Sequence, residues 1–494
     1  MGVRTGKQYI EGLRDGRRIF VNGEKVRDVA EYPPFKGVIG EIAALYDRHH
    51  DPALASQLTY ESPTTGEPVS SSFLLARNRD EMMKRVRGER MRAEFVGGMM
   101  GRQPDFMNAL VTDMAAARAH FGRNEPAYGK NVWNYYELCR EKDLCLTHAL
   151  VDPQIDRSKG VTAQEALHIA AENDRGLVVS GARMLATLAA VSDEIVIAPF
   201  ANRARGEEDF AIVFALPAAA PGLTFICRQT YDRGDSKFDR PLTGRYDEGD
   251  ALAIFDNVLV PWERIFAARD LDIYNHIRPV LPGYLWLQAT IRSAAKLRFM
   301  AGLATLVAEA VGRTALPRYQ ELIGGVVGDV ELADGLVRGA ADQLLENVTA
   351  LASAPGEAGG AGQRIGGSHG TLNKGLVGVS AVRLFFPEAH ERAVQAIRLI
   401  GSSGLVMTPG ERDFDNAEIS EILARHFKGR DKTARERVKI MKMAWDSISG
   451  DFGGRQMLYE WFFAGDPFNN RILYYNSPLN HRCTELARGL LGSD

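Results

Sequence analysis

The chain has 494 residues, of which 45% are hydrophobic and 25% charged, a balance typical of a globular protein with a large buried core. Its 60 lysines and arginines nearly offset 63 aspartates and glutamates, so no basic excess points to nucleic acid as a partner. No apolar run approaches the ~18 residues of a membrane helix, the N-terminus is too polar for a signal peptide, and the four scattered cysteines suggest no disulfide framework. We therefore expect a cytoplasmic globular protein, either an enzyme or an assembly, that engages neither nucleic acid nor a membrane.

The first ~145 residues combine helix-favouring segments with loops rich in glycine and proline. The segment 81–100 predicts a helix that weakens at its paired glycines, because glycine opposes helix formation. The segment 106–122 predicts a second helix with Gly122 as its C-cap. This part of the chain is therefore expected to be mainly helical.

One cation lies in an otherwise apolar stretch between these helices. The string 98-GMMGRQPDFMNAL-110 places Arg102 among methionine, phenylalanine and leucine. Arginine is almost never fully buried without a partner. Arg102 is therefore expected either to pair with an internal carboxylate such as Asp105 or to receive an anionic ligand.

Short β-branched runs dominate the next region, from about residue 146 to 265. A helix-like stretch, 162–174, comes first, and runs of four to twelve residues separated by Gly, Pro and Asp follow it. Such runs predict an antiparallel β-domain, and the absence of β-α-β alternation and of a G-x-G-x-x-G motif argues against a Rossmann domain. The predicted strands are Leu177–Ser180, Glu194–Ile197, Phe210–Phe214, Leu223–Cys227 and 251–262.

Helical periodicity returns from about residue 285 to 450. Long helices joined by short connections predict a helical bundle, interrupted by a Gly/Ala/Pro-rich loop at 353–367. The four predicted helices are 288–312, 318–352, 376–401 and 433–449.

The order of these regions predicts an α+β protein that is mostly α. We expect a helical domain at 1–145, a β-domain at 146–270, and a four-helix bundle with an extended tail at 271–494. This order resembles that of the acyl-CoA-dehydrogenase-like flavoproteins, in which flavin lies between the β-domain and the bundle. Fold order alone does not establish the chemistry.

Eight strings in collinear order along nearly the whole chain carry a family resemblance. They are 5-TGKQYIEGLRDGRRIFVNGEKVRDV-29, 44-ALYDRHHDP-52, 101-GRQPDF-106, 147-THALVDPQIDR-157, 178-VVSGARMLAT-187, 247-DEGDALAIFDNVLVPWE-263, 402-SSGLVMTP-409 and 451-DFGGRQMLYE-460. Together these strings resemble the oxygenases of the 4-hydroxyphenylacetate 3-hydroxylase family. The resemblance implies a two-component aromatic monooxygenase that receives reduced FAD from a separate NAD(P)H:flavin reductase, reacts with O2 through a flavin C4a-hydroperoxide, and hydroxylates phenols; some members displace halide or nitro groups.

The resemblance also implies a phenol pocket formed by Arg102, Phe106 and His148. A histidine of near-neutral pKa can accept the phenolic proton, and a guanidinium can hold the resulting oxyanion. Taken alone, Arg102 would more often be a surface or ion-paired residue and His148 a structural histidine. At the position of Phe106, 4-hydroxyphenylacetate hydroxylases often carry tyrosine, so the substrate is expected to be a different ring, such as a chlorophenol, a nitrophenol or a biosynthetic phenol.

The resemblance implies flavin contacts from three strings: 147–157, 178–187 and 452–455. The strings 147–157 and 178–187 provide polar and backbone groups, although the residues that follow, 188–193, lack the polar residues common in the family. In 452–455, two glycines allow close backbone approach and Arg455 can face the FAD pyrophosphate, while a C-cap turn after a helix ending near Ser449 is an alternative. The implied cofactor-binding residues are His148, Ala149, Leu150, Gln154, Asp156, Arg157, Thr187, Phe452, Gly453, Gly454 and Arg455.

Two other functions remain as alternatives: a same-fold flavoenzyme acting on a thioester, like acyl-CoA dehydrogenases or 4-hydroxybutyryl-CoA dehydratases, and a catalytically silent scaffold. The dehydratases need cysteine ligands for an iron–sulfur cluster, and 98–110 contains no cysteine. No H-E-x-x-H or clustered Cys/His spacing suggests a metal, and no G-x-S-x-G motif suggests a hydrolase.

The C-terminal segment 459–476 is rich in aromatic residues. Large apolar patches usually mark interfaces, so we expect this tail to wrap a neighbouring subunit in a homotetramer. The alternative is that the tail packs on its own bundle. Because the sequence contains no nicotinamide-binding fingerprint, we also expect that the chain does not reduce FAD itself.

Overall fold

The computed structural model describes residues 2–153, 155, 165–353 and 377–492. The N-terminal part is mainly helical, as predicted. The helix expected at 81–100 is confirmed as α4, which ends before two glycines with positive φ, and the helix expected at 106–122 is divided into α5 and α6, with Gly122 as the C-cap of α6. The α-helices are α1 (Gly6–Gly12), α2 (Lys36–Asp47), α3 (Ala55–Leu58), α4 (Arg79–Phe95), α5 (Pro104–Ala116), α6 (Arg118–Phe121) and α7 (Pro126–Lys142).

Two sheets form the middle of the molecule. The larger has the strand order β2-β1-β10-β11-β7-β6 and the smaller β12-β9-β8-β5. Most neighbours are antiparallel, as predicted, while β1–β10 and β5–β8 are parallel. The first thirty residues supply β1 and β2, so the start of the chain completes the larger sheet. The strands are β1 (Arg18–Val21), β2 (Glu24–Val26), β5 (Leu146–Ala149), β6 (His168–Asn173), β7 (Gly176–Thr187), β8 (Glu194–Ile197), β9 (Ile212–Pro217), β10 (Leu223–Cys227), β11 (Asp250–Pro261) and β12 (Ile265–Ala268), and β3 (Thr59–Glu61) and β4 (Pro68–Ser70) form a separate hairpin.

The predicted helix at 162–174 is wrong for the residues that the structure describes. His168–Asn173 is strand β6, which lies at the edge of the larger sheet and pairs antiparallel with β7. Alanine and glutamate favour a helix in isolation, but pairing with a long neighbouring strand overrides so weak a preference. Most of β6 is exposed, which explains why its sequence carries no apolar alternation.

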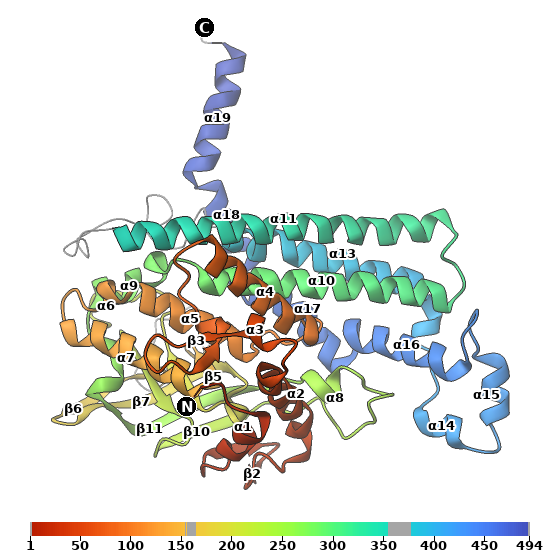
Figure 1. Cartoon of the computed structure of the whole chain (residues 1–494), viewed down its shortest axis with the longest axis horizontal. Coiled ribbons are helices and arrows are strands. Elements are labelled where there is room, and N and C mark those ends of the chain that lie inside the picture. The colour runs from red at the N-terminus through yellow and green to blue at the C-terminus, as the bar shows by residue number, and fades with distance from the viewer. Residues whose placement is uncertain (1, 154, 156–164, 354–376, 493–494) are drawn as a thin grey trace.

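The C-terminal part is the predicted bundle of long helices. Its central helix, α10, packs against α11 and α13 of the bundle and against α4 and α5 of the N-terminal part. Figure 1 shows α10, α11 and α13 lying lengthwise above the sheets. A π-helical turn, Ala381–Phe385, precedes α13, because Pro387 cannot donate the hydrogen bond of a regular helix. The helices are α8 (Thr243–Tyr246), α9 (Leu271–Val280), α10 (Tyr284–Ala310), α11 (Pro317–Ser353), α12 (Val377–Ser380), α13 (Phe386–Gly401), α14 (Glu411–Asp415), α15 (Ser420–His426) and α16 (Ala434–Ile448).

The expected α+β class, with its helical, β and bundle regions, is thus confirmed, while the exact domain boundaries stay predictions. The predicted loop at 353–367 lies outside the described residues except for Ser353, the last residue of α11. None of the described helices is both long and apolar enough to cross a membrane.

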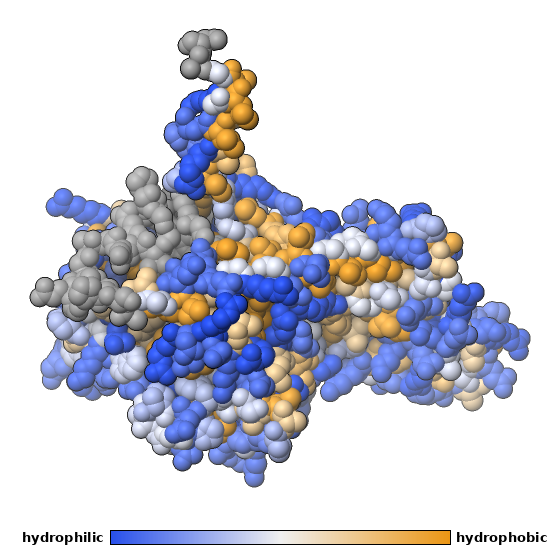
Figure 2. All heavy atoms as spheres, turned by 45° about the horizontal axis from the view of Figure 1, so that its top comes forward, coloured by the Kyte–Doolittle hydropathy of each residue, from blue (hydrophilic) through white to orange (hydrophobic). Residues whose placement is uncertain are grey.

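The tail consists of α17 (Gly450–Phe462), α18 (Pro467–Tyr475) and α19 (Pro478–Leu491). Helix α19 leaves the body of the molecule and has no buried residue. Leu479, Leu486 and Leu490 recur at helical spacing and are 55%, 71% and 85% exposed. Figure 2 shows this apolar stripe along α19. An isolated helix with such a face is stable only when another surface covers it.

Candidate active site

Arg102 lies in the turn between α4 and α5, and glycines allow this turn to pack tightly. Gly98 has φ 65°, and a Cβ there would lie 2.5 Å from the backbone nitrogen of Lys296 in α10. Pro104 then occupies the first turn of α5, where its missing N–H is not needed. The glycine-rich sequence therefore fixes Arg102 between α10 and the sheets.

Three groups hold the Arg102 guanidinium. Its Nε donates to His148 Nε2 at 3.0 Å, and its Nη1 donates to the Gly101 carbonyl at 3.2 Å and to the Tyr459 hydroxyl. The guanidinium carbon lies 4.0 Å from the centre of the Phe106 ring, a cation–π contact. Its Nη2 has no hydrogen-bond partner among the described residues. The predicted pocket residues Arg102, Phe106 and His148 are thus brought together, each less than a tenth exposed.

The charge of Arg102 has no carboxylate partner within ion-pair distance in the described part of the chain. Asp105 is buried in α5, and its pKa is raised by burial, an effect that Arg92 partly opposes. The Glu248 carboxylate accepts from the Arg102 backbone N–H at 2.5 Å, not from its side chain. Of the two roles that the sequence left open for Arg102, the structure therefore favours an anionic ligand.

His148 is a neutral, buried histidine on β5. This strand pairs with β8 in parallel, with His148 opposite Val196. Burial, and to a lesser degree the Arg102 charge, lower the pKa of His148 well below its ordinary value. Its Nε2 accepts from Arg102, so the proton of the neutral ring lies on Nδ1, which is buried and has no partner among the described residues. The ring centre of His148 is 5.9 Å from that of Phe106.

Two carboxylates beneath this turn join several predicted site residues. Arg455 forms a bidentate pair with Asp250 at 2.8 Å and also contacts Glu248 at 3.2 Å. The Thr187 hydroxyl donates to Asp250 at 2.7 Å. Although burial alone would raise it, Arg455 and Arg228 hold the pKa of Asp250 well below its ordinary value. Glu248 and Asp250 therefore connect the Arg102 turn to the end of β7 and to α17.

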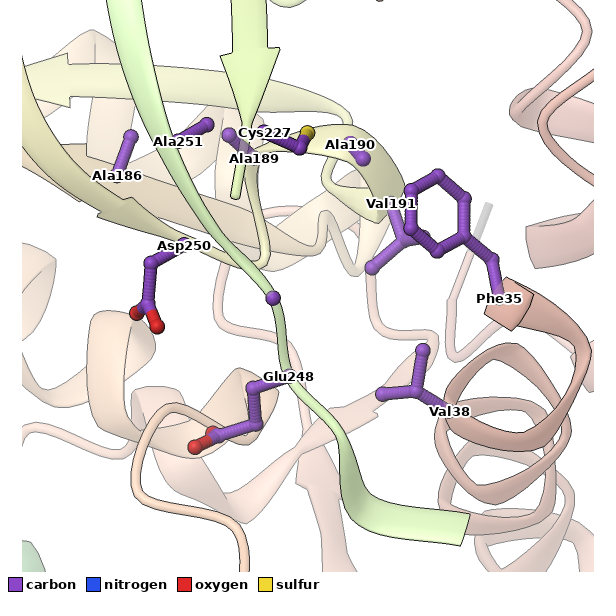
Figure 3. Close-up of a pocket in the computed structure, with 11 residues that line it drawn as sticks. Phe35, Val38, Ala186, Ala189, Ala190, Val191, Cys227, Glu248, Asp250 and Ala251 are labelled. Carbon is purple, nitrogen blue, oxygen red and sulfur yellow. The ribbon is translucent and has the colours of Figure 1, made fainter. Parts of the chain in front are cut away.

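A small cavity adjoins the same two carboxylates. Figure 3 shows Glu248 and Asp250 on one side of it and the apolar side chains of Phe35, Val38 and Val191 on the other. Its volume of about 10 Å³ is near the minimum for one water molecule. It is too small for an aromatic substrate.

Ala149, Leu150 and Arg455 are among the remaining predicted flavin-binding residues that the structure describes. Ala149 ends β5, and the Leu150 carbonyl accepts from Arg183 at 3.0 Å. Gln154, Asp156 and Arg157 lie outside the described residues. The contact of Arg455 with a pyrophosphate stays a prediction, because two carboxylates already engage its guanidinium.

The string 452-FGGR-455 lies within α17, so the alternative of a C-cap turn is wrong. Ser449 ends α16 and α17 begins at Gly450, whose φ is 65°. A Cβ at Gly453 would lie 2.7 Å from the Ile448 backbone, so this glycine permits the close turn between the helices. A Cβ at Gly454 would meet no atom within 4 Å, and Phe452 is buried.

Sequence reasoning missed Tyr459, Glu248 and Asp250. All three belong to strings that carry the family resemblance, but no role was assigned to them individually. A signal was present in the helical spacing of Arg455, Tyr459 and Phe463, which places these side chains along one face of α17. Only the tertiary structure shows that this face meets Arg102.

Comparison with known proteins identifies the family. The models for the N-terminal and C-terminal parts of 4-hydroxyphenylacetate 3-hydroxylase match residues 5–267 and 284–492. The chain is 34% identical to the 4-hydroxyphenylacetate 3-monooxygenase oxygenase component of Geobacillus sp. (strain PA-9), covering 99% of this chain and 97% of the relative, and 35% identical to that of Thermus thermophilus, covering 96% and 94%.

Solved structures agree. A crystal structure of such an oxygenase component with FAD and 4-hydroxyphenylacetate superposes with a TM-score of 0.87 at 33% identity, covering 99% of each chain. An archaeal 4-hydroxybutyryl-CoA dehydratase from N. maritimus, 20% identical and covering 100% of this chain and 96% of the dehydratase, shares the fold with a TM-score of 0.82. The chain belongs to the 4-hydroxyphenylacetate 3-hydroxylase family.

Proposed function

We propose that this chain is the oxygenase component of a two-component monooxygenase, which uses reduced FAD and O2 to hydroxylate a phenol or a related aromatic ring. The observation that carries the proposal is the state of Arg102, a buried cation with a free Nη2 and no carboxylate partner among the described residues. A phenolate fits these surroundings, because it offers an anionic oxygen to the guanidinium and an aromatic ring to the apolar side chains nearby.

Arg102 and His148 divide the work on the substrate. The phenolic oxygen binds Arg102 Nη2, and His148 accepts its proton at Nε2, which gives up the hydrogen bond that it accepts from Arg102 Nε in the empty site. The low pKa of His148 makes this transfer unfavourable in the empty site. A phenolate held beside the new imidazolium offsets that penalty, because the two opposite charges form together in a site with little water. The ionised ring is then more reactive towards an electrophilic oxygen.

FAD is the cofactor, and the donors around β5 and β7 fit a planar ring system with polar edges. His148 Nδ1 and the Nε and Nη2 atoms of Arg183 are buried without partners among the described residues. Thr187 keeps lone pairs free to accept while it donates to Asp250. The described residues that would hold the flavin are therefore Thr187, Arg183 and the 148–150 backbone. When bound in its reduced form, the flavin activates O2 for transfer to the ring.

A separate NAD(P)H:flavin reductase supplies the reduced flavin by diffusion. The absence of a nicotinamide-binding fingerprint supports this division of labour. Reduced FAD is then expected to bind more tightly than oxidised FAD, since the chain must capture it from solution. A supply of NAD(P)H and four unpaired cysteines fit action in the cytoplasm.

The chain assembles as a homotetramer through its tail. The exposed apolar stripe of α19 supports this assembly, together with Phe468 and Tyr475 of α18, which are 72% and 73% exposed. A second copy of the chain is the occupant that covers this face in the proposed assembly.

The ring that is hydroxylated differs from 4-hydroxyphenylacetate in its substituents. Phe106 offers an apolar face where relatives that act on 4-hydroxyphenylacetate often have a hydroxyl. A relative from Rhodococcus sp. is a 4-nitrophenol 2-monooxygenase oxygenase component, 32% identical over 94% of this chain and 86% of the relative. Chloro- and nitrophenols are therefore the first substrates to test.

The test combines binding with product analysis. Protein is titrated anaerobically with reduced FAD, mixed with O2 and a panel of phenols, and the products are separated by chromatography. A hydroxylated product supports the proposal. Flavin oxidation without product from any phenol contradicts it, and failure to bind reduced FAD favours the silent scaffold. Oxidation or dehydration of an acyl-CoA thioester would favour the same-fold alternative.

A further inference from the structure

The phenol side chain of Tyr459 is hydrogen-bonded to the Arg102 guanidinium. The residue lies on α17, and its hydroxyl accepts from Arg102 Nη1 and donates to the Gly101 carbonyl at 3.1 Å. Burial raises the pKa of Tyr459, although Arg102 and Arg292 oppose the increase, so the hydroxyl stays protonated near neutral pH. Both hydrogen-bonding functions of this hydroxyl are therefore used at the phenol site.

The position of Tyr459 is fixed from two sides. Its ring stacks on Phe463 with centres 4.9 Å apart and planes 4° from parallel. On the other side, a Cβ at position 101 would lie 2.3 Å from Tyr459 Cζ, so only glycine allows this approach. The contact therefore depends on matched residues in segments that are far apart in the sequence.

Arg292 supports the same face of α17 from α10. Its guanidinium carbon lies 5.2 Å from the ring centres of both Tyr459 and Phe463. Arg292 is itself held by a buried ion pair with Glu460, which also accepts from Lys296 at 2.9 Å. The Tyr459 ring thus has little freedom to turn away from Arg102.

Tyr459 engages one arm of the Arg102 guanidinium, whose five N–H groups form a fixed planar fork. His148 accepts a hydrogen bond from the Nε–H group, and the Gly101 carbonyl and the Tyr459 hydroxyl accept hydrogen bonds from Nη1. Both Nη2 protons remain without a partner among the described residues. Tyr459 and His148 bind opposite ends of the fork, so they fix the direction in which Nη2 points.

We propose that Tyr459 is a positioning residue of the phenol site, which orients the Arg102 fork so that Nη2 meets the phenolic oxygen. The proposal rests on the proposed function and goes beyond it, because it assigns a role to α17 in substrate ionisation. Phe106 presents only a ring face to Arg102, so the hydroxyl that sets the fork comes from α17 and not from α5.

The experiment measures 4-nitrophenol, whose absorbance distinguishes phenol from phenolate, bound to the flavin-free protein. The wild type is expected to lower the pKa of the bound probe. Tyr459→Phe keeps the stacked ring but loses the hydroxyl. It should weaken binding roughly 3- to 10-fold, the size of one hydrogen bond, and reduce the pKa shift of the probe. Tyr474→Phe on α18, which removes a hydroxyl bonded to Ser380 of α12, is the matched control and should change neither quantity.

The outcomes separate this inference from the proposed function. If Arg102→Ala abolishes the probe shift while Tyr459→Phe binds and ionises the probe like the wild type, the positioning role is overturned and the phenol site stands. If the wild type neither binds nor ionises 4-nitrophenol or any other phenol, both are overturned. A smaller shift in Tyr459→Phe, with unchanged binding of reduced FAD, supports the inference, since general structural damage would also weaken flavin binding.

Discussion

Replacing His148 and Arg102 separately should produce two distinct defects. In His148→Ala the phenol binds Arg102 but keeps its proton, so hydroxylation should slow by roughly 10²–10⁴, the usual loss for a general base. In Arg102→Ala the phenolate loses a charge-assisted hydrogen bond of about 1.5–3 kcal/mol, which corresponds to roughly 10- to 150-fold weaker substrate binding. Its effect should lie mainly in affinity.

The pH dependence separates the two variants further. A phenol with a pKa of about 10 gains about 30-fold more phenolate between pH 7 and pH 8.5. Substrate ionised in solution no longer needs a base, so the rate of His148→Ala should recover in part over this range. Arg102→Ala should show no such recovery, because its deficit is the missing cation.

Single-turnover rapid mixing of the reduced-flavin complex with O2 and substrate measures both effects, with product quantified at each pH. His276→Ala on α9, with its side chain 39% exposed, and Arg175→Ala, at an exposed position after β6, are the matched controls and should behave as the wild type. If His148→Ala turns over normally at neutral pH, His148 is structural and the reasoning about the base is refuted. Full rescue of Arg102→Ala by high pH would refute the assigned role of the guanidinium.

Other outcomes follow from particular contacts. Gly101→Ala should displace the Tyr459 ring and weaken phenol binding at least as much as loss of the hydroxyl does; unchanged binding would show that the contact is dispensable. Burial lowers the pKa of His390 to about 3, so below pH 6.5 the unfolded chain binds a proton that the native state does not. Urea unfolding should therefore show a free energy of unfolding about 2 kcal/mol lower at pH 5 than at pH 8. The loss should be smaller in His390→Gln, which has no titrating side chain at this position. Leu486→Glu with Leu490→Glu should lower the molar mass measured by light scattering, and an unchanged mass would exclude α19 from the interface. Purified protein with FAD should oxidise NADH no faster than FAD alone, and rapid oxidation would contradict the need for a reductase.

The long helices were predictable because their signals are local. Glycine and periodic apolar residues mark the end of α4 and the course of α10, and both agree with the structure. The strand β6 was not predictable in this way, since its conformation depends on pairing with β7. At that edge the local preference of Ala and Glu gives no information about the sheet.

The candidate site was predictable only where family strings supplied residues. Arg102 and His148 are 46 residues apart and yet lie within hydrogen-bond distance, as their family positions implied. Tyr459 is 357 residues beyond Arg102, and no periodicity or spacing joins the two. Their contact arises from the packing of α17 against the turn before α5, which only the folded chain reveals.

Helix α17 links the proposed subunit assembly to the phenol site, so the specific activity is expected to depend on protein concentration. One of its faces carries Tyr459, which bonds Arg102, and Arg455, which pairs with Asp250, while Leu458 and Phe462 on the same helix are 63% and 54% exposed. A neighbouring subunit that binds the tail, as proposed, would therefore also restrain α17, the helix whose Tyr459 orients Arg102. Dilution below the assembly threshold would then misalign the pocket before the fold itself is lost, and specific activity would fall with protein concentration.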